Sequence, residues 1–445
     1  MTDPDLLALA RAQFGLNIGF HILFPALTIG LGWFLLYFRL RHVRTGDAEW
    51  LAVYRLWTKI FALSFAMGVV SGITMSFQFG TSWPGYMLRV GNIAGPLLSY
   101  EVLFAFFLEA TFLGVMLFGM NRVSTRLHVA ATALVAVGTT LSAFWILALN
   151  SWMQTPAGFT VEDGQLIAAD WLRVIFNPSF PYRLAHMMVA SGLTAGFALA
   201  GLSAWRLLRL PGDRPALRGA RTGLAVAALL APLQVAIGDL HGLNTLEHQP
   251  AKIAAIEALW KTRSGAPLVL FAVPDEAARE NRYPVEIPKA ASVILRHRPD
   301  AVVQGLDEFA PDNPPVTPVF FAFRAMVGTA FVMIAVAWAG MWVTRGGRLP
   351  SRRFLWILTG MSISGWVATI CGWLVTEIGR QPWLVTGIVR TADAVGDVPP
   401  QQLGATFAGY VFVYGVLLVA YLVVIAHLAA AGAEAAASRP PAVAP

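Results

Sequence analysis

Four side chains of types that ligate haem iron lie in or at the end of long apolar segments. They are His21 in NIGFHILFP, His186 in PYRLAHMMVAS, Met326 in FFAFRAMVGTA and Glu377 in TEIGRQPW. Imidazole and thioether form the axial pair of a low-spin, electron-transfer haem, whereas a single histidine or a weak carboxylate leaves iron a position for oxygen. If the four residues reach a similar depth on different helices, the set fits more than one haem.

Each of these residues also has an ordinary interpretation. A lone histidine at a membrane end is commonly an interfacial polar residue, and we keep that interpretation for His427, at the far end of the last apolar segment. A methionine in an apolar helix is usually core filler, so Met326 carries little weight without its neighbours. The haem interpretation therefore depends on the elements that bring the four residues together.

Cysteine usage narrows the choice of cofactor. Cys371 is the only cysteine in the chain. A disulfide framework, an iron–sulfur cluster held by this chain alone and a covalent C-x-x-C-H haem each need at least two thiols. Any cofactor of this chain must therefore be held by His, Met or carboxylate.

Two acids interrupt another apolar run, GPLLSYEVLFAFFLEATFLG. Glu101 and Glu109 are eight residues apart, which is roughly 12 Å along a helix and nearly the same face. A carboxylate in hydrocarbon costs at least about 2.5–3.5 kcal/mol on insertion scales and usually marks an ion or proton path. We predict a proton relay; the alternative is a pair of acids neutralised by a partner such as Lys59 or protonated for packing.

A polar stretch between two apolar segments, EHQPAKIAAIEALWKTR, predicts a short amphipathic helix with Lys252, Glu257 and Trp260 near one another. An ordinary solvated helix is the simple interpretation. A hydroquinone, however, needs an apolar slot at the membrane surface and a proton-accepting group, and this stretch offers both.

The composition identifies the elements that position these residues as membrane helices. Of 445 residues, 57% are hydrophobic and 13% are charged, about half the charged share of soluble proteins. The net charge of +7 comes from basic residues in short loops between apolar runs, which indicates a bilayer rather than nucleic acid. The first segment lacks the basic start and cleavage site of a signal peptide, so we expect it to remain.

We predict an all-α polytopic membrane protein with nine transmembrane helices, because unpaired backbone groups are not tolerated in hydrocarbon. The apolar segments cover residues 15–38, 54–78, 94–120, 128–150, 183–207, 221–239, 319–343, 354–376 and 404–430.

Arginines cluster in every second loop, after the first, third, fifth and seventh segments. The positive-inside rule therefore predicts the N-terminus outside and the C-terminus in the cytoplasm. The predicted organisation is helices one to six in residues 1–239, an extracytoplasmic loop in 240–318, helices seven to nine in 319–430 and a disordered cytoplasmic tail in 431–445.

These residues resemble one family, subunit I of the cytochrome bd quinol oxidases. The resemblance covers nearly the whole chain, through FGLNIGFHILFPALTIGLGW, TMSFQFGTSWPGY, GPLLSYEVLFAFFLEATFLG, LNSWMQTPAGF, QPAKIAAIEALW, FAFRAMVGTA and GWLVTEIGRQPW. The compact outer loop resembles the short form of the family's quinol-binding loop, the Q-loop, which some members share with cyanide-insensitive oxidases.

The resemblance implies roles for individual residues. His186 and Met326 match the ligands of a low-spin haem b, and His21 and Glu377 match residues that serve two oxygen-side haems, a high-spin haem b and a haem d or further haem b. The other matches are Arg324, Arg380 and Trp373 near the haems, Lys252 and Glu257 at the quinol, and Glu101 and Glu109 on the proton path. Arg380 would also balance charge on Glu377 or on the haem acids.

By the resemblance, the chain oxidises quinol at the outer face and reduces O2 to water with protons from the cytoplasm, separating charge without a pump. It implies a bacterial cytoplasmic (inner) membrane, a heterodimer with subunit II, possible small single-span accessory subunits and no nucleic acid. The ligands do not fix the haem type or the quinone.

Two other functions are compatible with parts of this pattern. A proton-coupled transporter would use Glu101 and Glu109 and usually shows repeat symmetry, which the sequence lacks. A di-haem quinone oxidoreductase that never meets oxygen would use His186 and Met326 but leave His21 and Glu377 unexplained.

Overall fold

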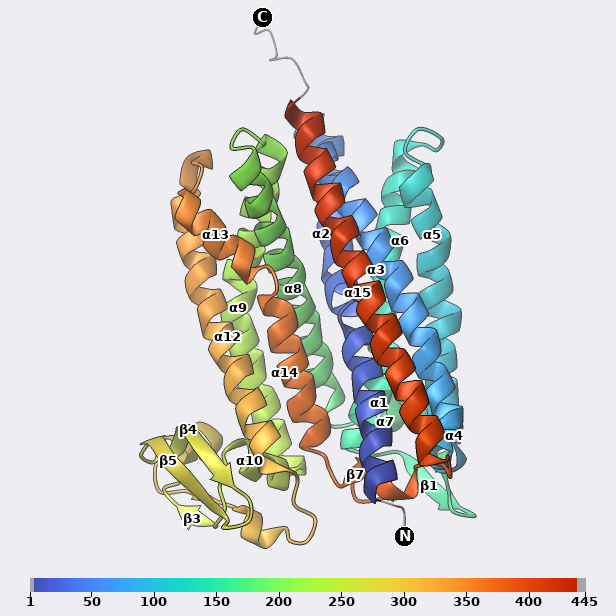
Figure 1. The fold of residues 1–445 in the computed structure, drawn as a ribbon, viewed down its shortest axis with the longest axis vertical. Helices are drawn as coiled ribbons and strands as arrows, with labels where there is room; N and C mark the ends of the chain where they lie inside the picture. The colour runs from blue at the N-terminus through green and yellow to red at the C-terminus, as the bar shows by residue number, and fades with distance from the viewer. Residues whose placement is uncertain (1–3, 438–445) are drawn as a thin grey trace, which may run out of the picture.

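The computed structural model describes residues 4–437 and is a bundle of long helices with small loops at its two ends (Figure 1). Nine helical segments of the described chain are long and apolar enough to cross a membrane, which confirms the predicted fold class. The spans are α1 (Pro4–Ile22) with α2 (Pro25–Thr45), α3 (Ala48–Thr81), α4 (Pro84–Tyr100) with η1 (Glu101–Phe106) and α5 (Phe107–Phe118), α6 (Thr125–Gln154), α8 (Phe180–Arg209), α9 (Arg214–His248), α12 (Val316–Val343), α13 (Arg352–Met361) with α14 (Ser364–Ile378), and α15 (Pro400–Ala437).

Three spans are interrupted within their length. The first breaks between α1 and α2, where Pro25 cannot donate a backbone hydrogen bond to the preceding turn. The third passes through a π-helical stretch, η1, which begins at Glu101. Such stretches are rare and frequently occur at functional sites. The eighth breaks between α13 and α14, so the helix that carries Glu377 begins only at Ser364.

Small residues allow the central helix α8 to pack closely against its neighbours. A Cβ on Gly365 of α14 would lie 2.4 Å from the Cα of Thr194, and one on Gly201 of α8 would lie 2.4 Å from the Cβ of Ser362. Such contacts hold helices together in a membrane, where burial of apolar surface gives no advantage over lipid. By contrast, only 11% of the most apolar part of α15 is buried inside the bundle, so α15 lies at its outside.

The connections at one end carry the small strands and short helices. They are β1 (Phe159–Glu162), β2 (Gln165–Ala168), α7 (Trp171–Ile175), α10 (Pro250–Ile256), β3 (Arg263–Ser264), β4 (Leu268–Asp275), β5 (Glu280–Ile287), α11 (Ala290–Arg296), β6 (Val302–Val303), η2 (Leu306–Glu308), β7 (Trp383–Val385), β8 (Val389–Arg390) and η4 (Thr391–Asp393). At the opposite end, η3 (Arg345–Gly347) joins α12 to α13. The strands form antiparallel pairs: β1 with β2, β4 with β5, β3 with β6 and β7 with β8.

The two ends of the bundle differ in what they carry. The start of α1 lies at the same end as the β-strands, and the end of α15 lies at the opposite end (Figure 1). The arginine-rich loops lie at that opposite end, which is the arrangement from which the positive-inside rule predicts an outer N-terminus. We call the strand-bearing end the outer end; the orientation itself stays a prediction.

Two segment boundaries differ from those expected. Helix α9 runs to His248, so the long outer connection begins after that residue rather than at 240. Helix α15 continues to Ala437, so residues 431–437 of the expected tail are helical, and residues 438–445 lie outside the described residues. Both helices continue past the apolar run because a helix can extend beyond the hydrocarbon into water.

Candidate functional site

His21 lies on the last turn of α1, directly before the break in the first span. Its Nδ1 is 3.0 Å from the hydroxyl oxygen of Ser71 on α3. The neighbouring residue on α3 is Gly72, where a Cβ would lie 3.2 Å from the Cε1 of His21. The hydroxyl orients the imidazole, and the glycine leaves room beside it.

Glu377 lies on the last turn of α14 and is held by two groups. Its Oε1 accepts a hydrogen bond of 2.9 Å from the side-chain amide of Asn150 on α6, and its Oε2 pairs with Arg380 at 2.5 Å. Arg380 is 5% exposed, and its remaining Nε and Nη1 have no partner within the described chain. Arg380 therefore has donors left for a second acidic group.

Two more basic side chains lie within electrostatic range of Glu377: Arg183 at the start of α8 and Lys252 on α10. Arg183 is 6% exposed, and its Nε has no partner within the described chain. Lys252 is 3% exposed and donates to the side-chain oxygens of Gln154 and Gln249, at 2.7 and 2.8 Å. Burial, and then the charges of Arg183 and Arg380, hold the pKa of Lys252 well below its usual value.

His186 lies on α8 and faces α9. Its ring centroid is 5.5 Å from that of His241, and a Cβ on Gly238 would lie 3.4 Å from its Cε1. Its Nδ1 is buried with no partner in the described chain, as is the Oε1 of Gln234 on α9, whose Nε2 donates to the His186 carbonyl. The second imidazole, His241, was not anticipated from the sequence.

Met326 lies on α12 with its sulfur against α14. A Cβ on Gly372 would lie 2.9 Å from the Sδ, so a side chain at this position would require the thioether to shift. Helix α14 and the turn after it also carry four polar residues at spacings of four, four and three: Thr369, Trp373, Glu377 and Arg380. These spacings place them along one face of the helix. The Thr369 hydroxyl and the Trp373 indole nitrogen are buried without a partner among the described residues.

The residues present fit haem as the group that they would hold. Unpaired polar groups in a protein interior are rare, because each lost hydrogen bond costs about 1–3 kcal/mol. Among the described residues, seven of the fourteen such atoms belong to α8, α9, α14 and the turn after α14, on Arg183, His186, Gln234, Thr369, Trp373 and Arg380. Guanidinium and indole N–H groups are donors for haem acid groups, and the three basic side chains around the one carboxylate, Glu377, leave positive charge to match them.

The two acids of the third span, the half-buried Glu101 and the buried Glu109, lie along α6. The hydroxyl of Ser142 donates to Glu101 at 2.8 Å. Glu109 is 5% exposed and lies against Gly138, where a Cβ would be 2.5 Å from its Cγ. Helix α6 therefore presents Gly138 to Glu109, Ser142 to Glu101 and Asn150 to Glu377, in order from its inner to its outer end. The described ion pairs do not join Lys59 to either acid, which removes that neutralising partner.

The outer loop differs in detail from the expected amphipathic helix. Helix α10 ends at Ile256, because Ala258 takes a positive φ of 48°, so Glu257 and Trp260 lie beyond it. Lys252 points to the Glu377 cluster. Glu257 pairs instead with Arg324 of α12 at 3.1 Å. Burial raises the pKa of the Glu257 carboxyl, and Arg324 opposes that shift.

Arg324 fastens this loop to the bundle. Its Nη2 donates to the carbonyl of Val269 on β4 at 2.7 Å, its Nη1 donates to the carbonyl of Ile256, and its guanidinium stacks on Phe320 at 3.9 Å. Most of its donors are therefore used within the chain. A contact between Arg324 and a haem acid stays a prediction.

The structure thus groups the candidate residues in three places. His21, His186, Met326, Trp373, Glu377, Arg380 and Lys252 lie in the outer part of the bundle, Glu101 and Glu109 follow α6 inward, and Glu257 joins Arg324. His427 is exposed on α15, away from all three. Sequence reasoning missed Arg183 and Asn150, although Asn150 begins the family motif NSWMQTP and Arg183 precedes His186 by three residues.

Comparisons with known proteins show the family of the chain. The family model described as cytochrome bd terminal oxidase subunit I matches residues 9–433. The chain is 33% identical over 425 residues to a cytochrome bd ubiquinol oxidase subunit 1 of Bacillus subtilis, covering 92% of this chain and 90% of the relative. It is 30% identical over 507 residues to a cytochrome bd-II ubiquinol oxidase subunit 1 of Escherichia coli, covering 98% and 99%.

Among solved structures, the bd oxidase from Geobacillus thermodenitrificans superimposes with a TM-score of 0.89 at 29% identity. The match covers 96% of this chain and 99% of that one.

These matches make the chain a membrane-bound cytochrome, an oxidoreductase that carries haem. More narrowly, the chain belongs to the cytochrome bd terminal oxidase subunit I family. It is a multi-pass protein of the bacterial cytoplasmic membrane.

Proposed function

We propose that the chain oxidises quinol near its outer end and reduces O2 to water at a di-haem site that takes protons from the cytoplasm, without pumping. Relatives named as ubiquinol and menaquinol oxidases support quinol as the reductant. The observation that carries the proposal is a group of buried donors with no partner in the described chain, on Arg183, Trp373 and Arg380, next to the ligand-type side chains His186 and Glu377. Bound haem would supply the electron transfer and the oxygen chemistry.

His186 and Met326 would hold a low-spin haem b. The chemistry of the pair supports this, since imidazole and thioether together favour electron transfer. Gly238 and Gly372 leave space next to the imidazole and next to the sulfur. The Trp373 indole, on the same face of α14 as Glu377, has an N–H without a partner among the described residues and could donate it to an acid group.

His21 and Glu377 would serve the two oxygen-side haems, a high-spin haem b and either a haem d or a further haem b. Arg380 holds Glu377 by a salt bridge, Asn150 holds it by a hydrogen bond, and Ser71 orients His21. Arg183, Arg380 and Lys252 would receive the haem acid groups, because together they outnumber the carboxylate. The ligand set alone does not distinguish haem d from haem b.

Protons would reach this site along α6. The acids Glu109 and Glu101 come from the third span, and the Ser142 hydroxyl bonds Glu101 directly. From Ser142 to Asn150 is eight residues, roughly 12 Å along the helix. The order Glu109, Glu101, Asn150, Glu377 thus leads from the inner half of the bundle to the outer, the direction that proton uptake from the cytoplasm requires.

Glu257 would accept a proton from the quinol. It lies at the membrane surface, and its raised pKa brings it nearer to neutrality, where a general base works best. Lys252 has a different place in the structure, beside Glu377 and Arg380, so a contact between Lys252 and quinol would need the loop to rearrange.

The functional enzyme would pair this chain with a subunit II, as the relatives' designation as subunit 1 supports. Small single-span subunits would complete the complex. The exposed apolar faces of α15 and of η1 are available for such partners or for lipid, with Phe412 72% and Phe104 58% exposed.

The test is oxygen consumption by the purified two-subunit enzyme in proteoliposomes, with duroquinol as the reductant. We expect steady oxygen uptake, a carbon monoxide difference spectrum, and release of as many protons outside as electrons used. No carbon monoxide response together with no oxygen uptake would overturn the proposal. If more protons were released outside than electrons were transferred, the enzyme would be a proton pump, and only the proposal that it does not pump would be overturned.

A further inference from the structure

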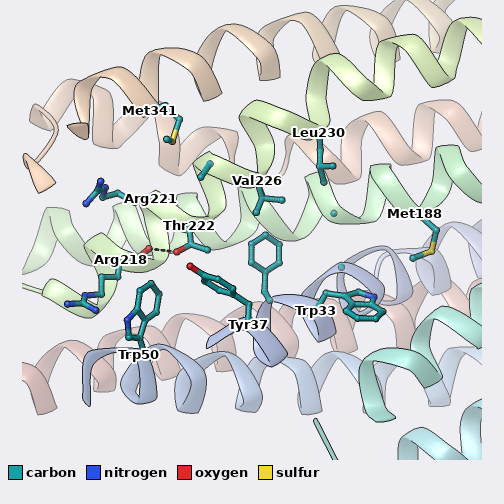
Figure 2. A pocket seen from close by; sticks show the side chains of 14 residues that line it. Trp33, Tyr37, Trp50, Met188, Arg218, Arg221, Thr222, Val226, Leu230 and Met341 are labelled. Atoms are coloured by element: carbon teal, nitrogen blue, oxygen red, sulfur yellow. Dashed lines mark hydrogen bonds between the residues drawn. The ribbon is translucent and has the colours of Figure 1, made fainter. Parts of the chain in front are cut away.

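A cavity of about 770 Å³ lies away from the candidate site, between α2, α8 and α9 (Figure 2). Its deeper walls are apolar, with Phe34, Met188, Val226 and Leu230. Arg218 and Arg221 lie at its other end. None of the proposed haem, quinol or proton residues lines it.

The cavity extends through one leaflet. From Arg221 to Leu230 along α9 is nine residues, roughly 13 Å, and half of a hydrocarbon core is about 15 Å thick. The arginine end belongs to the basic end of the bundle, opposite the outer loops. Trp33 and Tyr37, which are 44% and 42% exposed, form a rim that is open to the side. A molecule lying in the inner leaflet can therefore reach the cavity laterally.

Positive charge gathers at the arginine end. Arg218 pairs with Asp47 at 2.6 Å and with Glu49, and Arg214 lies 3.9 Å from Glu49. Asp47 and Glu49 are therefore already paired with Arg218 and Arg214. Arg221 is exposed and forms no ion pair with another described residue.

Aromatic groups complete that end of the cavity. The indole of Trp50 has Arg218 and Arg41 over its ring, at 5.0 and 5.4 Å. The hydroxyl of Tyr37 points toward Arg218 and Thr222 (Figure 2). Hydrogen-bond donors and the Arg221 guanidinium thus converge above an apolar crevice, where tryptophan and tyrosine suit the depth of lipid headgroups.

We propose that this cavity binds one anionic phospholipid of the inner leaflet. Its phosphate lies at Arg221 and the Tyr37 hydroxyl, and one acyl chain follows Phe34 and Val226 toward Leu230. A guanidinium favours phosphate over a neutral headgroup. A quinone has a head without charge and would leave Arg221 unmatched, so this arginine selects the phospholipid.

The experiment is native mass spectrometry of the intact two-subunit oxidase after delipidation and addition of dioleoylphosphatidylglycerol, dioleoylphosphatidylethanolamine or ubiquinone. We expect wild-type protein to retain one phosphatidylglycerol most strongly. Arg221→Glu should lower that retention about tenfold, the size expected when one charge-assisted contact is lost. Arg126 is exposed at the start of α6, at the arginine-rich end of the bundle and outside the cavity. Arg126→Glu makes the same charge change there and should retain the lipid.

A second pair of variants tests the acyl-chain position without touching charge. Val226→Trp fills the crevice and should reduce retention, whereas Val419→Trp makes the same change at a 62% exposed position on α15, which contributes no residue to the cavity, and should not. Haem absorbance checks that every variant is folded. Equal retention in Arg221→Glu and Arg126→Glu, equal binding of the two phospholipids, or loss of ubiquinone rather than lipid in Val226→Trp would overturn the proposal.

Discussion

Glu377 shows how single side chains stabilise a charge inside the membrane. Removing one partner of a buried ion pair usually costs about 3–5 kcal/mol, because the other charge is left without compensation. Here Arg380 supplies the opposite charge and Asn150 supplies a neutral donor to the second oxygen. These two contacts hold the carboxylate in position, as its proposed role as an iron ligand requires.

Asn150→Ala tests this support. A hydrogen bond to a charged group contributes about 1.5–3 kcal/mol, so we expect oxygen consumption to fall about tenfold or more. The oxygen-side haem spectrum should shift while the low-spin band stays. Turnover with duroquinol and a visible spectrum measure both. Asn92→Ala removes a similar amide on the exposed outer surface, where Asn92 bonds Gln165, and should leave both readouts unchanged; equal effects of the two variants would contradict the role of Asn150.

The Glu257–Arg324 pair predicts a pH dependence. Glu257 accepts a proton only when ionised, and burial raises its pKa, so turnover falls as the pH drops through that raised value. Arg324 lowers the same pKa. Arg324→Gln should therefore move the acidic limb of kcat/KM for quinol to higher pH.

The control for this profile is Glu247→Gln, an exposed acid at the end of α9. Its profile should match that of the wild type. An acidic limb that stays in place in Arg324→Gln, or moves to lower pH, would show that Glu257 does not govern quinol oxidation.

At the scale of elements, helix α6 organises the proposed proton path, and the interrupted spans supply its groups. The π-helical stretch η1 turns Glu101 toward Ser142, and the break before α2 leaves His21 at a helix end beside Ser71. Glycine at position 138 is what lets α5 and α6 approach with Glu109 between them. The path therefore depends on helix packing as much as on the acids.

Gly138→Ala tests that packing. The added methyl carbon would lie 2.5 Å from the Cγ of Glu109 and must displace the carboxylate. We expect a large loss of oxygen consumption with normal haem absorbance, since the proposed haem ligands lie farther toward the outer end. Gly114→Ala on α5, where a Cβ meets nothing within 4 Å, is the matched control. Normal turnover of Gly138→Ala, or a loss of its haem, would argue against this path.

Much of this architecture can be read from the sequence, for physical reasons. Apolar runs and arginine placement reveal spans, because hydrocarbon excludes charge, and that same exclusion makes Glu101 and Glu109 conspicuous. Arg183 was missed because an arginine at the end of a span looks like an ordinary interfacial residue. The end of α10 at Ile256 was not predicted because it depends on the positive φ of Ala258, and alanine rarely adopts a positive φ.

Over the whole molecule, the candidate haem ligands come from spans that are far apart in sequence and pack in one bundle. His21, His186, Met326 and Glu377 come from the first, fifth, seventh and eighth spans. The outer loop is fastened over them by Arg324, and Lys252 reaches down from it to the Glu377 cluster. Quinol oxidation and oxygen reduction would thus take place within one end of the molecule, with protons supplied from the other.

The most direct measurement is the reduced-minus-oxidised spectrum of the purified two-subunit oxidase carrying His186→Ala, with and without carbon monoxide. We predict that the low-spin haem band disappears while the carbon monoxide response of the other haems remains. His427→Ala, an exposed histidine on α15, should keep both signals. A low-spin band at full intensity in His186→Ala would contradict the assignment of this chain's own side chains as the haem ligands.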